Sequence, residues 1–406
     1  MTEADDVIDL ESLNGQDIDI YNLEGFSPTI VDAQYLNDLG IKTKPSAETL
    51  NGLKTGSELF LKRLREHTVI PRPSLALDEI DLDVEPEIHN YTGHCPTLTY
   101  EINPTLGCNV GCLYCLVTDG VHEQQLTTFT NYDLYVRKIL EDHLGEQHYY
   151  YFSPKTEALQ EPTLQTGIAH RILREFVRHY ELYPDSKARL FIASKGGARQ
   201  LRYEHEGESI LDLFVQLKDR MQFNTSVSIM PPAFRSIIEP YAATIEERLE
   251  AVRLCQENGV MANSALVQPI VVPYLTQENI EAFFGLLHEN GIVNYKPEFL
   301  TLCMENLAML GQILGYYDKD LERELYEYYI APENADHRKQ RGRTAPNRSS
   351  SIDYLKRMMA VTDKLGMSIS ICYWVRQQLG IGEDMIPVIN RNGFQCLGYQ
   401  SRLFDN

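Results

Sequence analysis

Strands and helices alternate along residues 96–304 of the chain. Leu98, Tyr100 and Ile102 alternate with polar residues, which predicts a strand that leads into a cysteine-rich loop. The same patterns predict five further strands, each preceded by a helix. We expect these strands at 147–153, 188–194, 223–230, 261–272 and 297–303, and the helices at 131–144, 166–183, 208–221, 244–259 and 276–291.

Six βα units in series predict an α/β fold, with a parallel sheet covered by helices on the outside. Six strands are fewer than a closed eight-stranded barrel needs, so we expect an open, partial (βα)6 TIM barrel over residues 96–304. Residues 1–95 are expected to form an N-terminal extension with a helix near 56–66. Residues 305–406 are expected to form a C-terminal extension that covers the barrel mouth, with helices around 305–330 and 350–365 and a strand at 367–374.

Composition and charge narrow the class of partner. The chain has 406 residues, 43% of them hydrophobic, and its formal net charge is −21. No apolar run is long enough for a membrane span, and the acidic N-terminus is unlike a leader peptide, so we expect a cytoplasmic protein. One basic run, 337–343 followed by Arg348, is interpreted as a solvated loop between two helices. The acidic surplus favours a small-molecule substrate over nucleic acid.

Three cysteines lie within eight residues, in the spacing C-x3-C-x2-C. Thiolates at Cys108, Cys112 and Cys115 can converge on one [4Fe-4S] cluster and leave its fourth iron without a protein ligand. A structural zinc site would need a fourth ligand, for which His122 is the nearest candidate, and plain packing is the other alternative. The remaining cysteines occur singly, which argues against a zinc framework and against a disulfide framework.

This loop, with Tyr114 directly before the third cysteine, resembles the signature of the radical S-adenosylmethionine (radical SAM) enzymes. The resemblance is closest to the spore photoproduct lyase branch, and it covers about half of the chain. It implies that SAM chelates the open iron and that the reduced cluster cleaves SAM to a 5′-deoxyadenosyl radical, which takes a hydrogen atom from the substrate. An electron donor such as a flavodoxin or ferredoxin is implied as well. Glu239 and Arg248 also lie at positions that fit this branch.

The resemblance further implies residues that bind SAM at the ends of successive strands, where parallel barrels place their ligands. Ser153, Thr156 and Glu157 replace the Gly-Gly-Glu that usually binds the methionine amino group, although Glu157 is also a plausible helix cap. Ser194 and Lys195 follow the third strand. Lys195 is expected to meet the methionine carboxylate, and an ordinary exposed lysine is the alternative.

The fourth and fifth strands are expected to hold the nucleoside. Ser226 and Ser228 share one face of the fourth strand and are expected near the ribose. Val267 and Gln268, with Tyr114, complete the expected cofactor contacts. The alternative for the apolar side chains of the fifth strand is a place in the hydrophobic core.

Two departures weaken the case for DNA repair. Pro154 stands where the lyases have their hydrogen-donating cysteine, and Phe129 stands at about the position of their helper tyrosine. Cys303 and Cys396 are the candidates to return a hydrogen atom, with a buried structural thiol as the alternative for each. Candidates for proton transfer near the mouth are Asp119, His122, Lys155 and Glu298.

We therefore expect a lyase, isomerase or oxidoreductase of radical SAM type that acts on a small polar metabolite. A sugar or aminocyclitol is favoured, with dehydration, epimerisation or rearrangement as the reaction. Two alternatives stay open: a divergent DNA-lesion lyase that reads DNA through residues 337–348, and a non-catalytic metal-binding module.

Overall fold

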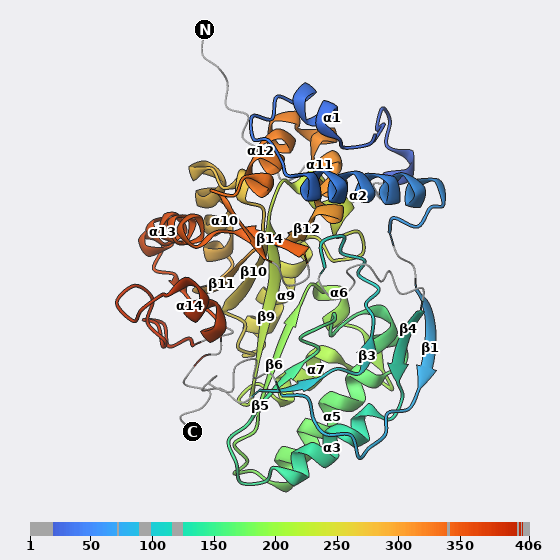
Figure 1. Cartoon of the computed structure of the whole chain (residues 1–406). Coiled ribbons are helices and arrows are strands. Elements are labelled where there is room, and N and C mark those ends of the chain that lie inside the picture. Colours follow the sequence, from blue (N-terminus) through green and yellow to red (C-terminus); the bar gives the residue numbers. More distant parts are fainter. Residues whose placement is uncertain are drawn as a thin grey trace.

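A seven-stranded parallel sheet organises the computed structural model, which describes residues 19–70, 73–88, 99–115, 125–338, 342–395, 398 and 400. The strands lie in the order β15-β11-β10-β9-β6-β5-β2; β11, β10, β9, β6 and β5 are labelled in Figure 1. The expected α/β fold of the partial-barrel type is confirmed, and β15 adds a strand beyond the six of the barrel. The strands are β2 (Thr99–Ile102), β5 (Tyr149–Phe152), β6 (Arg189–Ser194), β9 (Met221–Ile229), β10 (Ser264–Ile270), β11 (Asn294–Phe299) and β15 (Ser368–Ile369).

Helices connect the strands and cover the outside of the sheet. Thr244 and Glu247 form the capping box that the sequence predicts, so the helix Ile245–Glu257 starts where expected. The helix expected at 208–221 is shorter, because Glu208 and Ser209 pair in a small hairpin first. The connecting helices are α3 (Tyr132–Asp142), α4 (Glu161–Gln165), α5 (Ile168–Leu182), α6 (Ala198–Leu201), α7 (Ile210–Gln216), α8 (Pro232–Ile238), α9 (Ile245–Glu257), α10 (Gln277–Glu289) and α13 (Arg348–Lys364); the hairpin is β7 (Glu204–His205) with β8 (Glu208–Ser209).

Alternate residues of each strand face the helices and the barrel interior. Tyr150 and Phe152 pack in the main hydrophobic core between sheet and helices. Tyr151, between them, packs instead against Phe191 of the neighbouring strand, with ring centroids 4.7 Å apart. The strand β9 is buried along its whole length. The interior therefore holds a polar and aromatic lining that is separate from the main core.

A second hydrophobic cluster joins the two chain extensions over one end of the sheet. Phe60 of the N-terminal extension and Leu310 of the C-terminal extension belong to it, together with Leu113, Met230 and Val271 at the carboxyl ends of barrel strands. We call its helices the cap; α1, α2, α11 and α12 lie together above the sheet in Figure 1. The elements are η2 (Ile20–Asn22), α1 (Ala33–Asp38), α2 (Ala47–Arg65), α11 (Met304–Tyr317), α12 (Lys319–Ile330) and η3 (Val272–Tyr274), the last of which contacts α12.

Two small sheets flank the barrel, and one of them corrects a prediction. The basic run at 337–343 was expected to be a solvated loop, but its residues 337–338 and Arg343 belong to two antiparallel strands, and Arg343 is only 7% exposed. The reason is pairing with a third strand and burial beside α12. The sheets are β1 (Ser74–Asp78), β4 (Gln125–Phe129) and β3 (Thr105–Leu106), and β12 (Leu302–Cys303), β14 (Arg343–Pro346) and β13 (Ala335–Arg338).

The last part of the chain returns to the amino ends of the barrel strands. Gln222 at the start of β9 donates to the carbonyl of Gly398 at 2.5 Å and accepts from the amide of Gln400 at 2.8 Å. The strand expected at 367–374 is limited to two residues, because α14 (Tyr373–Leu379) begins within that range. The C-terminal segment thus contributes to the cap, to the sheet edge and to the closure of the amino ends.

Candidate active site at the cysteine loop

The cysteine loop follows β2 and β3 and lies at the carboxyl end of the sheet. The amide of Leu113 donates to the carbonyl of Ile238 at 2.9 Å, and the amide of Tyr241 donates to the carbonyl of Val110 at 3.3 Å. Gly111 has φ +69°, and a Cβ there would lie 3.3 Å from the Tyr241 ring. The turn therefore needs a glycine, both for its backbone conformation and for its close contact with the segment after α8.

The three cysteines at this loop form no disulfide. Burial raises the pKa of the Cys108 thiol to about 12, although hydrogen bonds from the amides of Val110 and Glu157 oppose the rise. Burial likewise raises the pKa of Cys112, and the positive charge of Lys195 opposes it. Thiols in this state are protonated at neutral pH, so a bound metal centre would have to displace their protons.

The spread of the sulfur atoms tests which metal centre fits. The ligand atoms of Cys108, Cys112 and Cys115 do not all lie within 4.8 Å of one another. Thiolates around a single tetrahedral zinc ion lie about 3.8 Å apart, since each Zn–S bond is about 2.3 Å. In an iron–sulfur cube each thiolate binds a different metal atom, so its sulfurs are spread more widely. The donor set therefore fits a cluster better than one ion.

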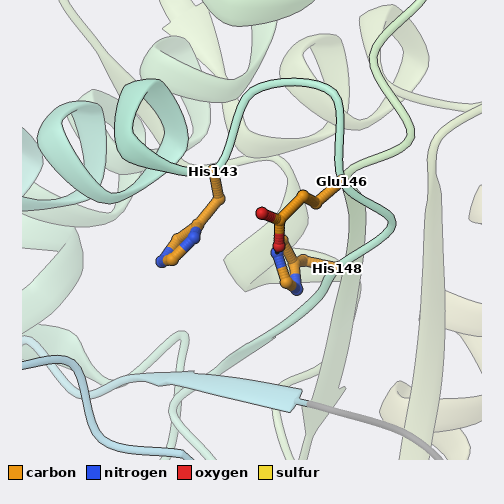
Figure 2. Close-up of side chains that lie close together, drawn as sticks. All are labelled: His143, Glu146 and His148. Carbon is orange, nitrogen blue, oxygen red and sulfur yellow. The ribbon is translucent and has the colours of Figure 1, made fainter.

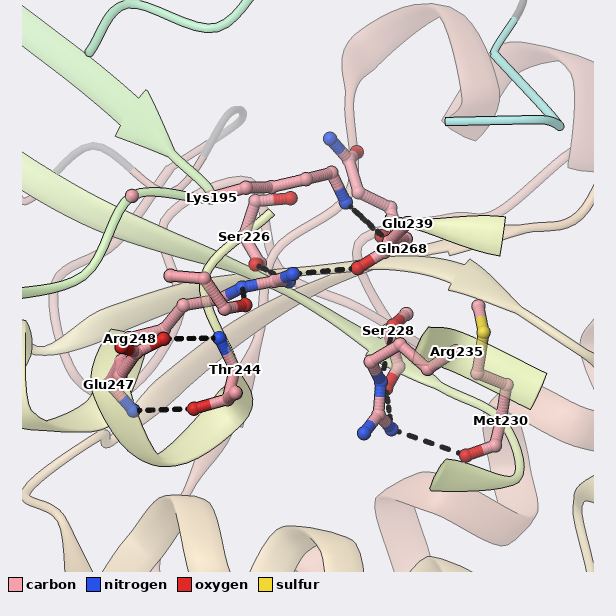
Figure 3. Close-up of polar contacts among 12 residues, drawn as sticks. Lys195, Ser226, Ser228, Met230, Arg235, Glu239, Thr244, Glu247, Arg248 and Gln268 are labelled. Carbon is pink, nitrogen blue, oxygen red and sulfur yellow. Dashed lines mark hydrogen bonds and ion pairs between the residues drawn. The ribbon is translucent and has the colours of Figure 1, made fainter. Parts of the chain in front are cut away.

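A buried ion-pair network lies beside the loop, with Glu239 at its centre. Tyr114 donates its hydroxyl to this carboxylate; Lys195 Nζ lies 3.0 Å from Oε1 and Arg248 Nη2 lies 2.7 Å from Oε2 (Figure 3). Burial by itself would raise the pKa of Glu239, but Lys195 and Arg248 together hold it well below its usual range. The carboxylate is thus anionic, and it pairs with two cations, of which Lys195 also acts on the Cys112 thiol.

The segment after β5 places Glu157 beside the same loop. Its carboxylate accepts hydrogen bonds from Ser194 Oγ at 2.5 Å, from the amide of Lys195 at 2.7 Å and from the amide of Leu159 at 3.1 Å. A carboxylate has about four acceptor positions, so three of them are used within the chain. Thr156 Oγ1 lies 3.2 Å from Thr105 Oγ1.

Two hydroxyls expected to contact SAM have no partner among the described residues. Ser153 is 2% exposed, has φ +52°, and its Oγ makes no hydrogen bond. Ser226 Oγ, in the middle of β9, is also buried and unpaired. A buried hydroxyl without a partner costs about 1–3 kcal/mol, so both side chains are suited to a polar ligand. Ser228 differs, because its Oγ accepts from Arg235 Nε at 3.0 Å.

The other predicted residues are distributed more widely. The backbone carbonyl of Gln268 accepts from Lys195 Nζ at 3.4 Å, whereas Val267 lies in the main hydrophobic core. Cys303 lies beyond the end of β11, in β12 and at the start of α11. Lys155 pairs with Glu101 at 2.9 Å. Glu298 lies 3.7 Å from Lys296. Cys396, Asp119 and His122 lie outside the described residues.

Sequence reasoning missed two side chains that support the site. Gln160 accepts from the amide of Asn109 at 2.9 Å and so holds the cysteine loop against the segment after β5. Arg235 also bonds the backbone carbonyls of Ser228 and Met230 at 3.1 and 3.2 Å (Figure 3). Both act through contacts between residues far apart in the chain or on neighbouring elements. A polar residue near a helix start carries no pattern that reveals such contacts.

Comparison with known proteins identifies the domain. Residues 102–287 match the family described as the Radical SAM superfamily. The chain is also 25% identical over 252 residues to "Uncharacterized protein ORF301" of Acidianus two-tailed virus, a match that covers 59% of this chain and 80% of the viral protein. The chain carries a radical SAM superfamily domain, which includes the cysteine loop and the strands from β5 to β10. A search of the described helices found none with the length and apolar character of a membrane span.

Proposed function

We propose that this chain is a radical SAM enzyme that abstracts hydrogen from a small polar metabolite. When bound, a [4Fe-4S] cluster and SAM supply a 5′-deoxyadenosyl radical for this abstraction. The observation that carries the proposal is the cysteine loop itself: three free thiols, with the charge of Lys195 acting on Cys112, lie at the end of the sheet, and Ser153 and Ser226 are buried without a partner among the described residues.

Cys108, Cys112 and Cys115 would hold the cluster. Three thiolates bring negative charge into a partly buried loop, and the positive charge of Lys195 opposes the rise in the pKa of Cys112. Opposite charge at short range stabilises the deprotonated thiols, which are the form that binds metal. Gln160 and the segment after α8 would keep the loop in place when the cluster is absent.

The unpaired polar groups support a site for SAM. Ser153 and Ser226 offer hydroxyls, and Glu157 keeps one acceptor position, which suits an ammonium group because charge-assisted hydrogen bonds are strong. Lys195 is already paired with Glu239, so it would meet a carboxylate as part of a shared network rather than alone. Tyr114 would orient this network. Thr156, Ser194, Ser228, Val267 and Gln268 complete the proposed contacts.

The substrate class is supported by the charge of the barrel interior. Tyr151 projects into this interior, and its pKa is raised by burial first and then by the nearby carboxylates Glu298, Glu157 and Glu101. Such a lining suits a hydroxylated or amino-bearing molecule, for example a sugar or aminocyclitol. Dehydration, epimerisation or rearrangement would follow from hydrogen abstraction, and a flavodoxin or ferredoxin would supply the electron.

Anaerobic reconstitution tests the function at two levels. The reduced protein is expected to release 5′-deoxyadenosine from SAM, and a Cys112→Ala variant is expected to release none. A panel of deuterated sugars and aminocyclitols should then identify the substrate by deuterium transfer into 5′-deoxyadenosine. No 5′-deoxyadenosine from a protein with a full cluster would favour the non-catalytic alternative. Sub-micromolar affinity for duplex DNA at physiological salt would instead overturn the substrate class.

A further inference from the structure

Three metal-ligating side chains gather at the other end of the sheet from the cysteine loop. His143 ends α3, and Glu146 and His148 follow in the short connection to β5 (Figure 2). Gly145, with φ +84°, reverses the chain between them, so the two later residues return over the helix end. One ligand atom from each residue lies within 4.8 Å of the others.

The potential metal ligands of this triad already contact one another. His148 Nε2 lies 2.8 Å from Glu146 Oε2. The His148 side chain belongs to a residue that is 4% exposed, and its Nδ1 has no hydrogen-bond partner among the described residues. The ring of His143 stacks on Tyr100 with centroids 4.7 Å apart. The unpaired Nδ1 of His148 is the ring nitrogen that does not face Glu146, so the case for the triad rests on its geometry. The two imidazole rings lie 4.7 Å apart, centroid to centroid, with the carboxylate beside them.

We propose that His143, Glu146 and His148 bind a divalent first-row transition metal ion, with zinc as the expected ion and water in the fourth position. Two imidazoles and one carboxylate are an established zinc donor set. Ligand atoms around tetrahedral zinc lie about 3.4 Å apart, so the triad must close by about 1.4 Å at most. Glu146 is exposed and its side chain is long, so it is free to make this movement.

The position of the triad in the fold also favours a cation. The triad lies at the carboxyl end of α3, where the unpaired carbonyls carry partial negative charge. No other such group of His, Cys, Asp and Glu ligand atoms occurs within the part of the chain that the structure describes.

The expected role of the ion is to fix the start of β2. Tyr100 of β2 contacts both imidazole rings: it stacks on His143, and it is edge-on to His148 with centroids 5.0 Å apart. A bound ion would hold α3, β5 and the strand beneath them as one unit, and β2 leads directly towards the cysteine loop. The site would thus stabilise the fold without contact with SAM, and it does not depend on the proposed reaction.

Calorimetric titration with zinc sulfate tests the site in a variant whose three loop cysteines are alanine. We expect one ion per chain, and at least about a tenfold loss of affinity in Glu146→Gln and in His143→Ala, because each removes a ligand. The exposed His288→Ala is the matched control and should bind like its parent. Cobalt should give visible ligand-field bands without thiolate charge-transfer bands.

The wild-type protein with its cluster loaded provides the second readout. Zinc should raise its thermal unfolding midpoint, and the same addition should have no effect on Glu146→Gln. His148→Ala removes a buried ring, so the two more exposed variants decide the outcome, with circular dichroism to establish that they fold. An absence of zinc binding, or equal affinity in Glu146→Gln and its parent, would overturn the site.

Discussion

The two ends of the parallel sheet both bury polar side chains, but they satisfy them in different ways. At the amino end, Asn294 donates to Ser264 Oγ at 2.7 Å and accepts from Ser370 Oγ at 3.0 Å and from Asn390 Nδ2 at 2.8 Å. Towards the carboxyl end, Ser153 and Ser226 have buried hydroxyls without partners among the described residues. The amino end also keeps such atoms, at Asn224 Nδ2 and Asn263 Oδ1, but beside its network of paired amides. The cysteine loop and a buried set of charges lie at this second end.

This difference separates a structural network from a binding site. A buried polar group that finds all its partners inside the protein adds stability and has no acceptor or donor left for a ligand. A buried group without a partner costs free energy, and proteins keep such groups mainly where a ligand completes them. The Asn294 network therefore belongs to the fold, whereas Ser153 and Ser226, which are unpaired, are the hydroxyls that we propose for the site.

The largest effect is expected from Cys112→Ala. Loss of one of three thiolates should prevent cluster assembly and abolish the release of 5′-deoxyadenosine, because the remaining two cannot hold the cube. The urea midpoint should change little. Iron content, visible absorption and product release measure the first effect, and Cys255→Ala, in the main core, is the matched control that should keep its cluster. Product release by Cys112→Ala would contradict the proposal.

Glu239→Gln is expected to have the next largest effect, this time on stability. It would leave Lys195 and Arg248 with unpaired positive charge, which typically costs about 3–5 kcal/mol when an ion pair is buried. Urea unfolding at neutral pH measures the loss. Glu250→Gln, which removes an exposed partner of Arg202, should cost at most about 1 kcal/mol. Equal losses in the two variants would show that the central carboxylate is not a buried anion.

Asn294→Ala, at the amino end, should lower stability and leave activity unchanged, which is the reverse of the result expected for Cys112→Ala. The change leaves Ser264 and Asn390 without their partner, and a loss of about 1–3 kcal/mol is expected. Activity per folded molecule should be retained, because no cofactor contact is proposed there. If the folded Asn294→Ala protein lost SAM binding, the two ends of the sheet would be coupled, and the amino-end network would not be purely structural.

The sequence was sufficient for the elements that depend on local pattern. The capping box at Thr244 and the alternating apolar residues of the strands place most helices and strands within a few residues. The cysteine spacing likewise identifies the loop and its family, because ligand spacing is a local property of the chain. These predictions needed no knowledge of what lies opposite each element.

Features that depend on contacts between distant residues could not be predicted in this way. The basic run contributes to a strand pair, because residues 302–303 provide a third strand. No local pattern in the sequence predicts this pairing. Lys195 was expected at a ligand carboxylate, whereas its partner inside the chain is Glu239, forty-four residues away. The hydrogen bonds of Gln222 to Gly398 and Gln400 likewise join residues far apart in the chain, so no local pattern predicts them.

The smallest expected effect is a pH dependence at the amino end. His179 is buried, with Nε2 2.7 Å from Ser186 Oγ, and burial lowers its pKa. A group whose folded pKa lies below its unfolded value of about 6.5 contributes stability above that pH, and the contribution is lost as the pH falls. We expect urea stability to decrease from about pH 7.5 to 5.5, and His179→Gln to reduce the slope. Glu239→Gln should keep it, because that carboxylate stays ionised throughout this range. A slope unchanged by His179→Gln would place the acid-sensitive group elsewhere.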